Sequence, residues 1–205
     1  MPKVNEEYLK ERREHILKSA KSCFARGGFH KTTMRDIQKK ASLSAGAVYR
    51  YFKSKEEIIE AIAKQDLEER VDLIGKTTQG SDPASRFEKL AEGFFSLLER
   101  KDKPFVGVEL ELWAEAQRNP KIMEIQRKSL ETIKQRFAAL IQAGQKNGEL
   151  FADFNPEAAA HFLISIRRGL VAQLAVNRKI DIGEYTATIT RILLRGLLVR
   201  KAGKE

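Results

Sequence analysis

Residues 16–59 carry the most informative pattern of this chain and read ILKSAKSCFARGGFHKTTMRDIQKKASLSAGAVYRYFKSKEEII. From Ile16 to Phe24 the apolar residues recur at intervals of three and four, which is the spacing of one face of an α-helix. The pair Gly27-Gly28 follows, and glycine is the residue most often found just beyond a helix end. We therefore expect a first helix that ends at these glycines.

Two short helices are expected after the glycine pair. Thr33 stands three residues before Asp36, which is the spacing of a capping box at a helix start. A second short helix is expected from about Ala45 to Tyr51, because Ser44 is a favoured N-cap residue. Since only the segment Ser42-Leu43-Ser44 joins the two helices, the pattern predicts a helix-turn-helix.

The positive charge of the chain is concentrated in this part. The net charge is +10, and residues 1–55 hold 14 Lys/Arg against 5 Asp/Glu, so they carry +9 of it. Such confinement is expected for a head that binds a polyanion. A basic helix on a membrane surface is the alternative, but it needs an exposed apolar face, whereas here the apolar positions are needed to close a small three-helix core.

The remainder of the chain also predicts helices, beginning with a long one that starts at about Lys55. The polar stretch 75–83 is rich in helix breakers and indicates a connection. Further helices are expected over residues 84–100, around Trp113, and over 121–145, 156–177 and 182–200. No alternation typical of β-strands is found. The predicted class is therefore all-α with about nine helices, a three-helix head at residues 1–55 and a helical bundle at residues 56–205.

The composition also bears on the cellular location. No run approaches the roughly 18 consecutive apolar residues of a membrane span, and the N-terminus lacks the apolar core of a signal peptide. We therefore expect a soluble, cytoplasmic protein without a membrane partner. The single cysteine, Cys23, falls at a core position and is interpreted as a buried structural thiol rather than a reactive one.

Patterns typical of catalysis or of metal binding are absent from the sequence. It contains no G-x-S-x-G, H-E-x-x-H or paired C-x-x-C motif, and no glycine loop that would hold a phosphate. His15, His30 and His161 fall in different predicted elements, and a histidine on an apolar helix, like His161, is more often a core or pocket residue than a metal ligand. We predict neither an enzyme nor a cofactor or metal site.

The order of residues in the helix-turn-helix segment has a counterpart in a known family. Residues 16–59 resemble the DNA-binding signature of the TetR family of bacterial regulators. The shared residues are Phe24, Gly28-Phe29, Thr32-Thr33, Ile37, Ala41, Leu43-Ser44, Gly46, Tyr49, Phe52 and Lys55. The chain departs from the common pattern at Gln38, Ser42 and Tyr51, where the family more often has Ala, Gly and His.

A second resemblance covers part of the remaining chain. The segment ELELWAEAQRNP, residues 109–120, and the helices after it resemble the C-terminal domains of betaine-regulator-like members of the family. The two resemblances imply a homodimeric repressor that binds a palindromic operator in double-stranded DNA and is released by a small-molecule effector. Residues 56–205 would then bind the effector and form the dimer. A constitutive architectural DNA-binding protein is the alternative, but it has no need of so large a body.

The physical requirements of DNA binding select the same helix-turn-helix. Its second helix must enter the major groove, which requires small, polar or cationic side chains on the side that faces the groove. Ala45, Gly46 and Ala47 are small, and Arg50 can hydrogen-bond a guanine edge with two donors. We assign base recognition mainly to Arg50, with a solvated surface arginine as the alternative.

Contacts to the DNA backbone are assigned to four residues. Thr33 lies at a predicted helix N-terminus, where a hydroxyl and free N–H groups suit a phosphate oxygen. Tyr49 and Tyr51 offer neutral donors, although a core position for Tyr49 is a serious alternative. The family resemblance places Lys55 on a phosphate.

The last two predicted helices offer a dimer interface. Each carries an apolar stripe that is too large to leave in water, and packing within the monomer is the alternative. Gly169 and Gly196 would allow a close approach of helices. The two stripes are Phe162, Ile166, Leu170 and Leu174, and Ile189, Ile192, Leu193 and Leu197.

The helices between residues 84 and 177 supply candidates for an effector pocket, which is usually apolar with a few polar groups. Ordinary core packing is the alternative. Carboxylates at Glu109 and Glu115 would favour a cationic ligand. The candidates are Phe94, Phe105, Glu109, Trp113, His161 and Gln173, with Phe95 and Phe137 as further aromatic residues of the same helices.

Overall fold

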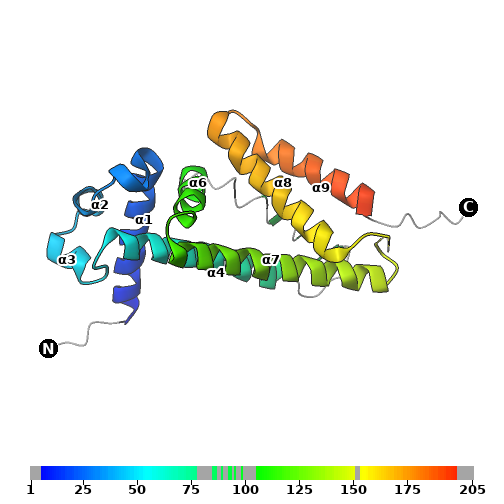
Figure 1. Ribbon diagram of the computed structural model, residues 1–205, viewed down its shortest axis with the longest axis horizontal. Coiled ribbons are helices and arrows are strands. Elements are labelled where there is room, and N and C mark those ends of the chain that lie inside the picture. The colour runs from blue at the N-terminus through cyan, green and yellow to red at the C-terminus, as the bar shows by residue number, and fades with distance from the viewer. Residues whose placement is uncertain are drawn as a thin grey trace, which may run out of the picture. The chain divides into compact units, whose positions relative to one another are not determined.

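The computed structural model describes residues 6–77, 105–150 and 153–197, and of the stretch between the first two ranges only residues 85, 86, 89, 92, 93, 95 and 98. Over these residues the assigned elements are eight helices (Figure 1), which confirms the predicted all-α class. They are α1 (Glu6–Lys31), α2 (Met34–Ala41), α3 (Ala45–Tyr49), α4 (Lys55–Thr77), α6 (Phe105–Ala116), α7 (Pro120–Lys146), α8 (Pro156–Val176) and α9 (Ile182–Leu197). The helix expected over 84–100 lies mostly outside the described residues.

The first helix contains a break at the predicted glycine pair. α1 runs from Glu6 to Lys31, but Gly28 has φ 72° and ψ 170°, which is not helical geometry. Residues with a side chain rarely adopt such a φ, so glycine is what permits the break. The chain resumes helical geometry for a few residues, and the expected helix end is therefore a break within α1.

Local side-chain contacts begin α2 and α3 as the sequence predicts. Thr33 is the N-cap of α2 in a complete capping box with Asp36. Ser44 is the N-cap of α3 and accepts a hydrogen bond from the Ala47 N–H at 3.3 Å. Between the two helices Ser42 adopts the left-handed conformation with φ 54°, the conformation for which the family pattern more often supplies glycine.

The chain forms two compact units. The first comprises residues 1–66 and 101–126, and the second comprises residues 67–100 and 127–205. Residues from two separate parts of the sequence therefore build the first unit. The division at residue 55 into a DNA-binding part and an effector-binding part concerns function, and it stays a prediction.

The core of the first unit contains side chains from α6 as well as from the N-terminal helices. Phe24 and Phe29 meet edge to face with their ring centroids 4.7 Å apart. Val108 and Leu112 of α6 are buried in the same cluster. Because α1 and α6 pack directly on each other, α6 is a structural part of the helix-turn-helix head.

Cys23 lies in this core. Its thiol is buried, and burial raises its pKa, with smaller effects from Arg26, Asp36 and Lys40. A thiol that is harder to ionise is a poorer nucleophile. The structure therefore agrees with a structural rather than a reactive cysteine.

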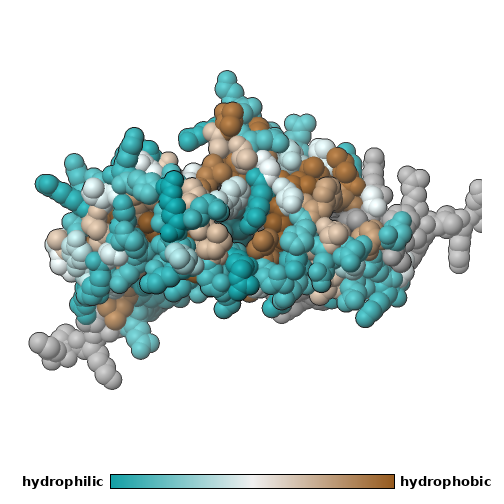
Figure 2. All heavy atoms as spheres, viewed as in Figure 1, coloured by the Kyte–Doolittle hydropathy of each residue, from teal (hydrophilic) through white to brown (hydrophobic). Residues whose placement is uncertain are grey.

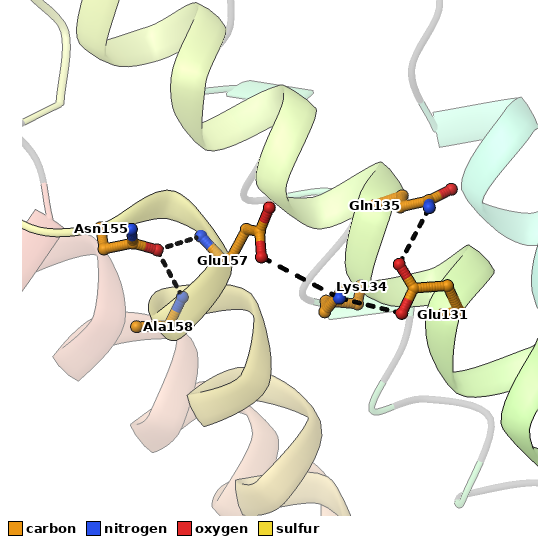
Figure 3. Close-up of polar contacts among 6 residues, drawn as sticks. All are labelled: Glu131, Lys134, Gln135, Asn155, Glu157 and Ala158. Atoms are coloured by element: carbon orange, nitrogen blue, oxygen red, sulfur yellow. Dashed lines mark hydrogen bonds and ion pairs between the residues drawn. The ribbon is translucent and has the colours of Figure 1, made fainter.

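In the second unit, polar contacts join the end of one helix to another (Figure 3). Asn155 caps α8 by accepting hydrogen bonds from the Glu157 and Ala158 N–H groups at 2.9 and 3.0 Å. Lys134 of α7 lies 2.9 Å from Glu131 and 4.0 Å from Glu157. Its hydrogen bond to Glu131 lowers the pKa of that carboxyl and raises the pKa of the lysine. Lys134 therefore links α7 to the first turn of α8, and pairs with an exposed carboxylate like Glu157 add little stability.

Each of the two apolar stripes predicted for a dimer interface has residues buried within the chain and residues exposed to solvent. Leu170, Leu174 and Leu193 are buried within the chain, which corrects their assignment to a dimer surface because α8 and α9 need them for their own packing. Phe162 and Ile192 remain 60% and 59% exposed. Figure 2 shows hydrophobic residues gathered over α8 and α9 on the viewed face. The side chain of Leu197 is outside the described residues.

α8 is, among the helices of the described ranges, the one that could cross a membrane by length and composition. It carries Arg167 and Arg168 near its middle, and Arg167 is almost completely buried. Arginine at the centre of a span is costly. We interpret α8 as a helix that packs within the protein.

Candidate nucleic-acid interface

The start of α2 is built by the capping box. Asp36 Oδ2 accepts hydrogen bonds from the Thr33 hydroxyl at 2.7 Å and from the Thr33 N–H at 2.9 Å. The Asp36 N–H in turn donates to the Thr33 hydroxyl at 3.2 Å. These bonds lower the pKa of Asp36. Both residues are exposed, so the N-terminus of α2 is open to a ligand in solution.

The solvent side of α3 is open and carries small side chains. Val48 is fully buried and anchors the opposite side of this helix in the core. Ala45 and Gly46 are exposed, and a Cβ added to Gly46 would meet no atom within 4 Å. Arg50, at the C-cap of α3, is exposed as well. Ala47 is half-buried. A surface of this kind can approach the floor of a groove, with one cation at its end.

The two tyrosines of the candidate site have different surroundings. Tyr49 is 42% exposed, so the structure leaves it outside the core, on the rim of α3. Tyr51 is half-buried and packs against the core of the first unit. Tyr49 is therefore the more accessible of the two.

Lys55 has partners within the protein. Its ammonium donates to the carbonyl oxygens of Phe29, Thr32 and His30 at 2.6, 3.0 and 3.4 Å. A cation is favourable beside carbonyls that a helix end leaves without helical partners. The side chain thus holds the end of α1, a role that the sequence-based assignment to a phosphate did not include.

Four exposed cations were absent from that assignment. Arg35, Lys39 and Lys40 project from α2, and Lys53 follows α3 and donates to the Tyr49 carbonyl at 2.9 Å. The signal was present in the sequence as three cations in the segment RDIQKKA. The spacing of apolar residues predicts Met34, Ile37 and Ala41 as the inward positions of this helix; the structure buries Ile37 and Ala41 and leaves the cations outside.

The effector candidates among the described residues fall in both units of the chain. Glu109 is buried at 3% exposure and Trp113 is half-buried, both on α6 in the first unit. His161 and Gln173 are exposed on α8 in the second unit. Phe94 and the side chain of Phe105 lie outside the described residues. Phe95 and Phe137 are buried, and Glu115 is half-buried.

No group of three or more His, Cys, Asp or Glu side chains that could hold a metal ion occurs in the described ranges.

Comparison with protein families gives two matches. Residues 16–62 match the family described as bacterial regulatory proteins, tetR family. Residues 83–198 match the C-terminal domain of BetI-type transcriptional repressors. Together the two matches cover the helix-turn-helix and most of the remaining chain.

Individual relatives are regulators of similar length. The chain is 30% identical over 175 residues to the HTH-type transcriptional regulator YfiR of Bacillus subtilis (strain 168), which covers 83% of each chain. It is 28% identical over 162 residues to UidR of Escherichia coli (strain K12), covering 79% of this chain and 81% of UidR.

Solved structures with the same fold include two of particular interest. GusR of Salmonella enterica has a TM-score of 0.69 at 28% identity, covering 94% of this chain and 98% of GusR. A transcriptional regulator from Saccharomonospora viridis in complex with choline has a TM-score of 0.80 at 23% identity, covering 93% and 100% of the two chains. The second likeness concerns the fold alone.

Proposed function

Because the chain belongs to the TetR family of bacterial regulatory proteins and has a BetI-type C-terminal domain, we propose that it represses transcription as a homodimer on a palindromic operator. As a member of that family it is a helix-turn-helix transcriptional regulator and not an enzyme. In this proposal residues 1–55 bind DNA, residues 56–205 form the dimer and bind a small-molecule effector, and the protein acts in the cytoplasm.

The observation that carries the DNA-binding part is the open face of α3 in a strongly basic head. Ala45 and Gly46 leave room for the helix to enter a major groove, and Arg50 is exposed beside them. Residues 1–55 carry a net charge of +9. We assign base recognition to Arg50 and close approach to the groove to Ala45, Gly46 and Ala47.

Backbone contacts in the proposal come from the edges of this face. Tyr49, on the rim of α3, can donate its hydroxyl to a phosphate. The Thr33 hydroxyl donates to Asp36, so in this proposal Thr33 exchanges that bond for one to a phosphate when DNA binds at the N-terminus of α2. Tyr51, also proposed as a backbone contact, is half-buried and therefore offers less surface than Tyr49. The exposed cations Arg35, Lys39 and Lys40 add phosphate contacts. Lys55 contributes indirectly, because its hydrogen bonds hold the C-terminal end of α1 next to the interface.

The dimer surface of the proposal is the exposed side of α8 and α9. Along α8 the residues Ala158, Phe162, Ser165, Gly169, Ala172 and Val176 are all exposed and recur at three- and four-residue intervals. Added Cβ atoms on Gly169 and Gly196 would meet nothing within 4 Å, so a second helix can approach closely. The exposed Phe162 and Ile192 supply the apolar area that such an interface buries.

The proposed effector is a mostly apolar or amphipathic small molecule that carries a cation. Glu109 is a buried carboxylate on α6, and Trp113 follows one helical turn later, which places the two side chains on the same side of α6. The solved structure of the Saccharomonospora viridis regulator contains choline, a small organic cation. We therefore propose quaternary ammonium compounds as the first class to test. His161 and Gln173, both exposed on α8, stay further candidates for contact with an effector.

The DNA-binding part is tested by selecting, from the genome of the source organism, the fragments that the purified protein retains. The expected result is a shared palindrome with half-sites about one DNA turn (~34–36 Å) apart. Fragments without a common sequence would favour an architectural DNA-binding protein.

The effector part is tested with the single tryptophan of the chain. Choline and neutral amphipathic molecules are titrated against the protein on its selected duplex. A true effector is expected both to release the duplex and to change the fluorescence of Trp113, which is half-buried. If no compound does both and the purified protein carries no bound molecule by mass spectrometry, the effector proposal fails.

A further inference from the structure

We infer that Glu111, on α6, is a positioning residue of the DNA interface, because its carboxylate holds the turn that leads into α2. The inference rests on the proposed function, since it concerns how the DNA-binding surface keeps its shape. It extends that surface to a residue far outside the N-terminal segment.

The contact is a direct one. Glu111 Oε2 accepts a hydrogen bond from the Phe29 N–H at 2.9 Å, across 82 positions of sequence. The same carboxylate lies against Gly28, where an added Cβ would be 2.9 Å from Oε1. Gly28 is also the residue at which α1 breaks, with φ 72°. The carboxylate therefore occupies the space that the missing side chain leaves at the break.

The opposite side of this turn is held by Lys55. The carbonyl of Phe29 accepts a hydrogen bond from the Lys55 ammonium at 2.6 Å. The Phe29 N–H thus donates to a carboxylate of α6, and the Phe29 carbonyl accepts from an ammonium group of α4. Thr32 donates its hydroxyl to the Gly28 carbonyl at 2.7 Å, and Thr33 then begins α2. Side chains thus contact the backbone of Gly28, Phe29 and Thr32 between the break and the start of α2.

α6 is a firm support for this contact. Val108 and Leu112, which flank Glu111 on the helix, are buried in the core that also contains Phe24 and Phe29. The carboxylate therefore has little freedom to follow the turn if the turn moves. Without it, the Phe29 N–H would lose a charged acceptor in a partly buried place, which a hydrogen bond to water restores only in part.

Removing the Glu111 side chain distinguishes its positioning role from the direct effect of its negative charge on DNA binding. Loss of one negative charge from a DNA-binding head should strengthen binding to a polyanion. Loss of a positioning contact should weaken it. The two explanations predict opposite signs for the same substitution.

The experiment compares full-length variants for affinity to the duplex recovered in the genomic selection, by fluorescence anisotropy at one fixed salt concentration. Glu111→Ala is expected to weaken binding about ten-fold. Glu111→Gln keeps an oxygen acceptor at the same reach and should stay within about two-fold of the wild type, whereas Glu111→Asp keeps the charge but is one methylene shorter and should behave like Ala. Glu14→Ala, an exposed carboxylate of α1, is the matched charge control and should not weaken binding.

A second pair of variants tests the contact itself. Gly28→Ala should weaken binding, because it introduces a Cβ beside the carboxylate at a positive φ. In the Glu111→Ala background only the φ cost remains, so the double variant should lose less affinity than the two single losses multiplied together. Additive losses would argue against direct contact between the two positions.

The inference is overturned if Glu111→Ala, folded by circular dichroism, binds as tightly as the wild type or more tightly. If Glu111→Ala does not fold, the Glu111→Gln and Glu111→Asp variants are compared instead. Tight binding by Glu111→Asp together with weak binding by Glu111→Gln would show that the charge of residue 111 matters and its reach does not, which would overturn the inference. If the wild type itself selects no duplex, the proposed function fails. If the wild type binds and the Glu111 variants match it, only the inference fails.

Discussion

Arg50 is the exposed side chain at the end of α3 that can read a guanine with two donors. We predict that Arg50→Ala lowers discrimination between the preferred base pair and its competitors by about 1–3 kcal/mol. The measurement is a binding-site selection performed with wild type and variant. Lys53→Ala removes an equal charge nearby and should weaken all sequences alike. Identical shifts of base preference in the two variants would contradict the assignment.

Lys55 tests whether an interface residue acts by direct contact or through the fold. Its three carbonyl partners predict that Lys55→Ala lowers the free energy of unfolding by about 1.5–3 kcal/mol, the range for hydrogen bonds to charged groups. Because the ammonium faces the protein, the slope of log K against log salt should stay unchanged. Urea unfolding and a salt titration of DNA binding measure the two quantities. A slope lower by about one, with unchanged stability, would instead indicate a phosphate contact.

At the scale of the element, α2 begins on a titratable cap. Hydrogen bonds, first from the Thr33 hydroxyl and then from its backbone N–H, lower the pKa of Asp36 in the folded state. A carboxyl whose folded pKa lies below its unfolded pKa stabilises the fold above the unfolded value of about 3.9, and this stabilisation is lost as the pH falls through the folded pKa.

We therefore predict that Asp36→Asn is less stable than the wild type at pH 7 and that the difference shrinks as the pH falls below the unfolded value of about 3.9 and the wild-type carboxyl becomes protonated. Urea unfolding over this pH range measures it. Glu14→Gln, an exposed carboxylate outside the cap, serves as the control. A difference that does not depend on pH would show that the charge of Asp36 has no part in the cap.

α6 shows that an element can belong to a unit far from its place in the sequence. Its apolar side buries Val108 and Leu112 in the head, and its polar side supplies Glu111 to the turn before α2. Arg118, just beyond the helix, lies 3.0 Å from the His30 ring in the same turn region. The head therefore includes side chains of α6 and of Arg118 in addition to residues 1–55.

For the whole molecule, the exposed side of α8 predicts the state of assembly. Phe162→Glu places a charge on the proposed interface and should weaken dimerisation at least about 30-fold, as expected for the loss of a hot spot worth about 2 kcal/mol. Light scattering at micromolar concentration measures the mass. Met123→Glu alters another exposed apolar residue, 40% exposed on α7, and should leave the dimer intact. A dimeric Phe162→Glu variant, or a monomeric wild type, would contradict the proposed interface.

The proposed repression by a dimer also sets a requirement for the effector. A single helix-turn-helix reaches few bases, whereas two α3 helices about one DNA turn (~34–36 Å) apart read a palindrome. An effector releases DNA only by binding the incompetent arrangement more tightly, and a change from 1:99 to 99:1 needs about 5.5 kcal/mol of difference. That magnitude favours a ligand with a sizeable apolar part.

The helix-turn-helix was determined by the sequence itself, because its signals are local. Thr33 and Asp36 are three residues apart, as are Ser44 and Ala47, and such contacts form within one helical turn. The all-α class and most helix limits follow from periodicity in the same way; α7 was expected over residues 121–145 and spans Pro120–Lys146. Residues this close can meet in only a few geometries, so spacing is sufficient to predict them.

Contacts between distant residues were decided by the tertiary structure. Lys55 meets the Phe29 carbonyl across 26 positions, and Glu111 meets the Phe29 N–H across 82. No spacing rule reaches so far: from the sequence, Lys55 was assigned only to a phosphate, by family resemblance, and Glu111 was one of several acids on its helix. The same holds for α8, which is apolar on more than one side. Periodicity marks such a helix as a packing element, but only the arrangement of its neighbours buries Leu170 and leaves Phe162 in solvent.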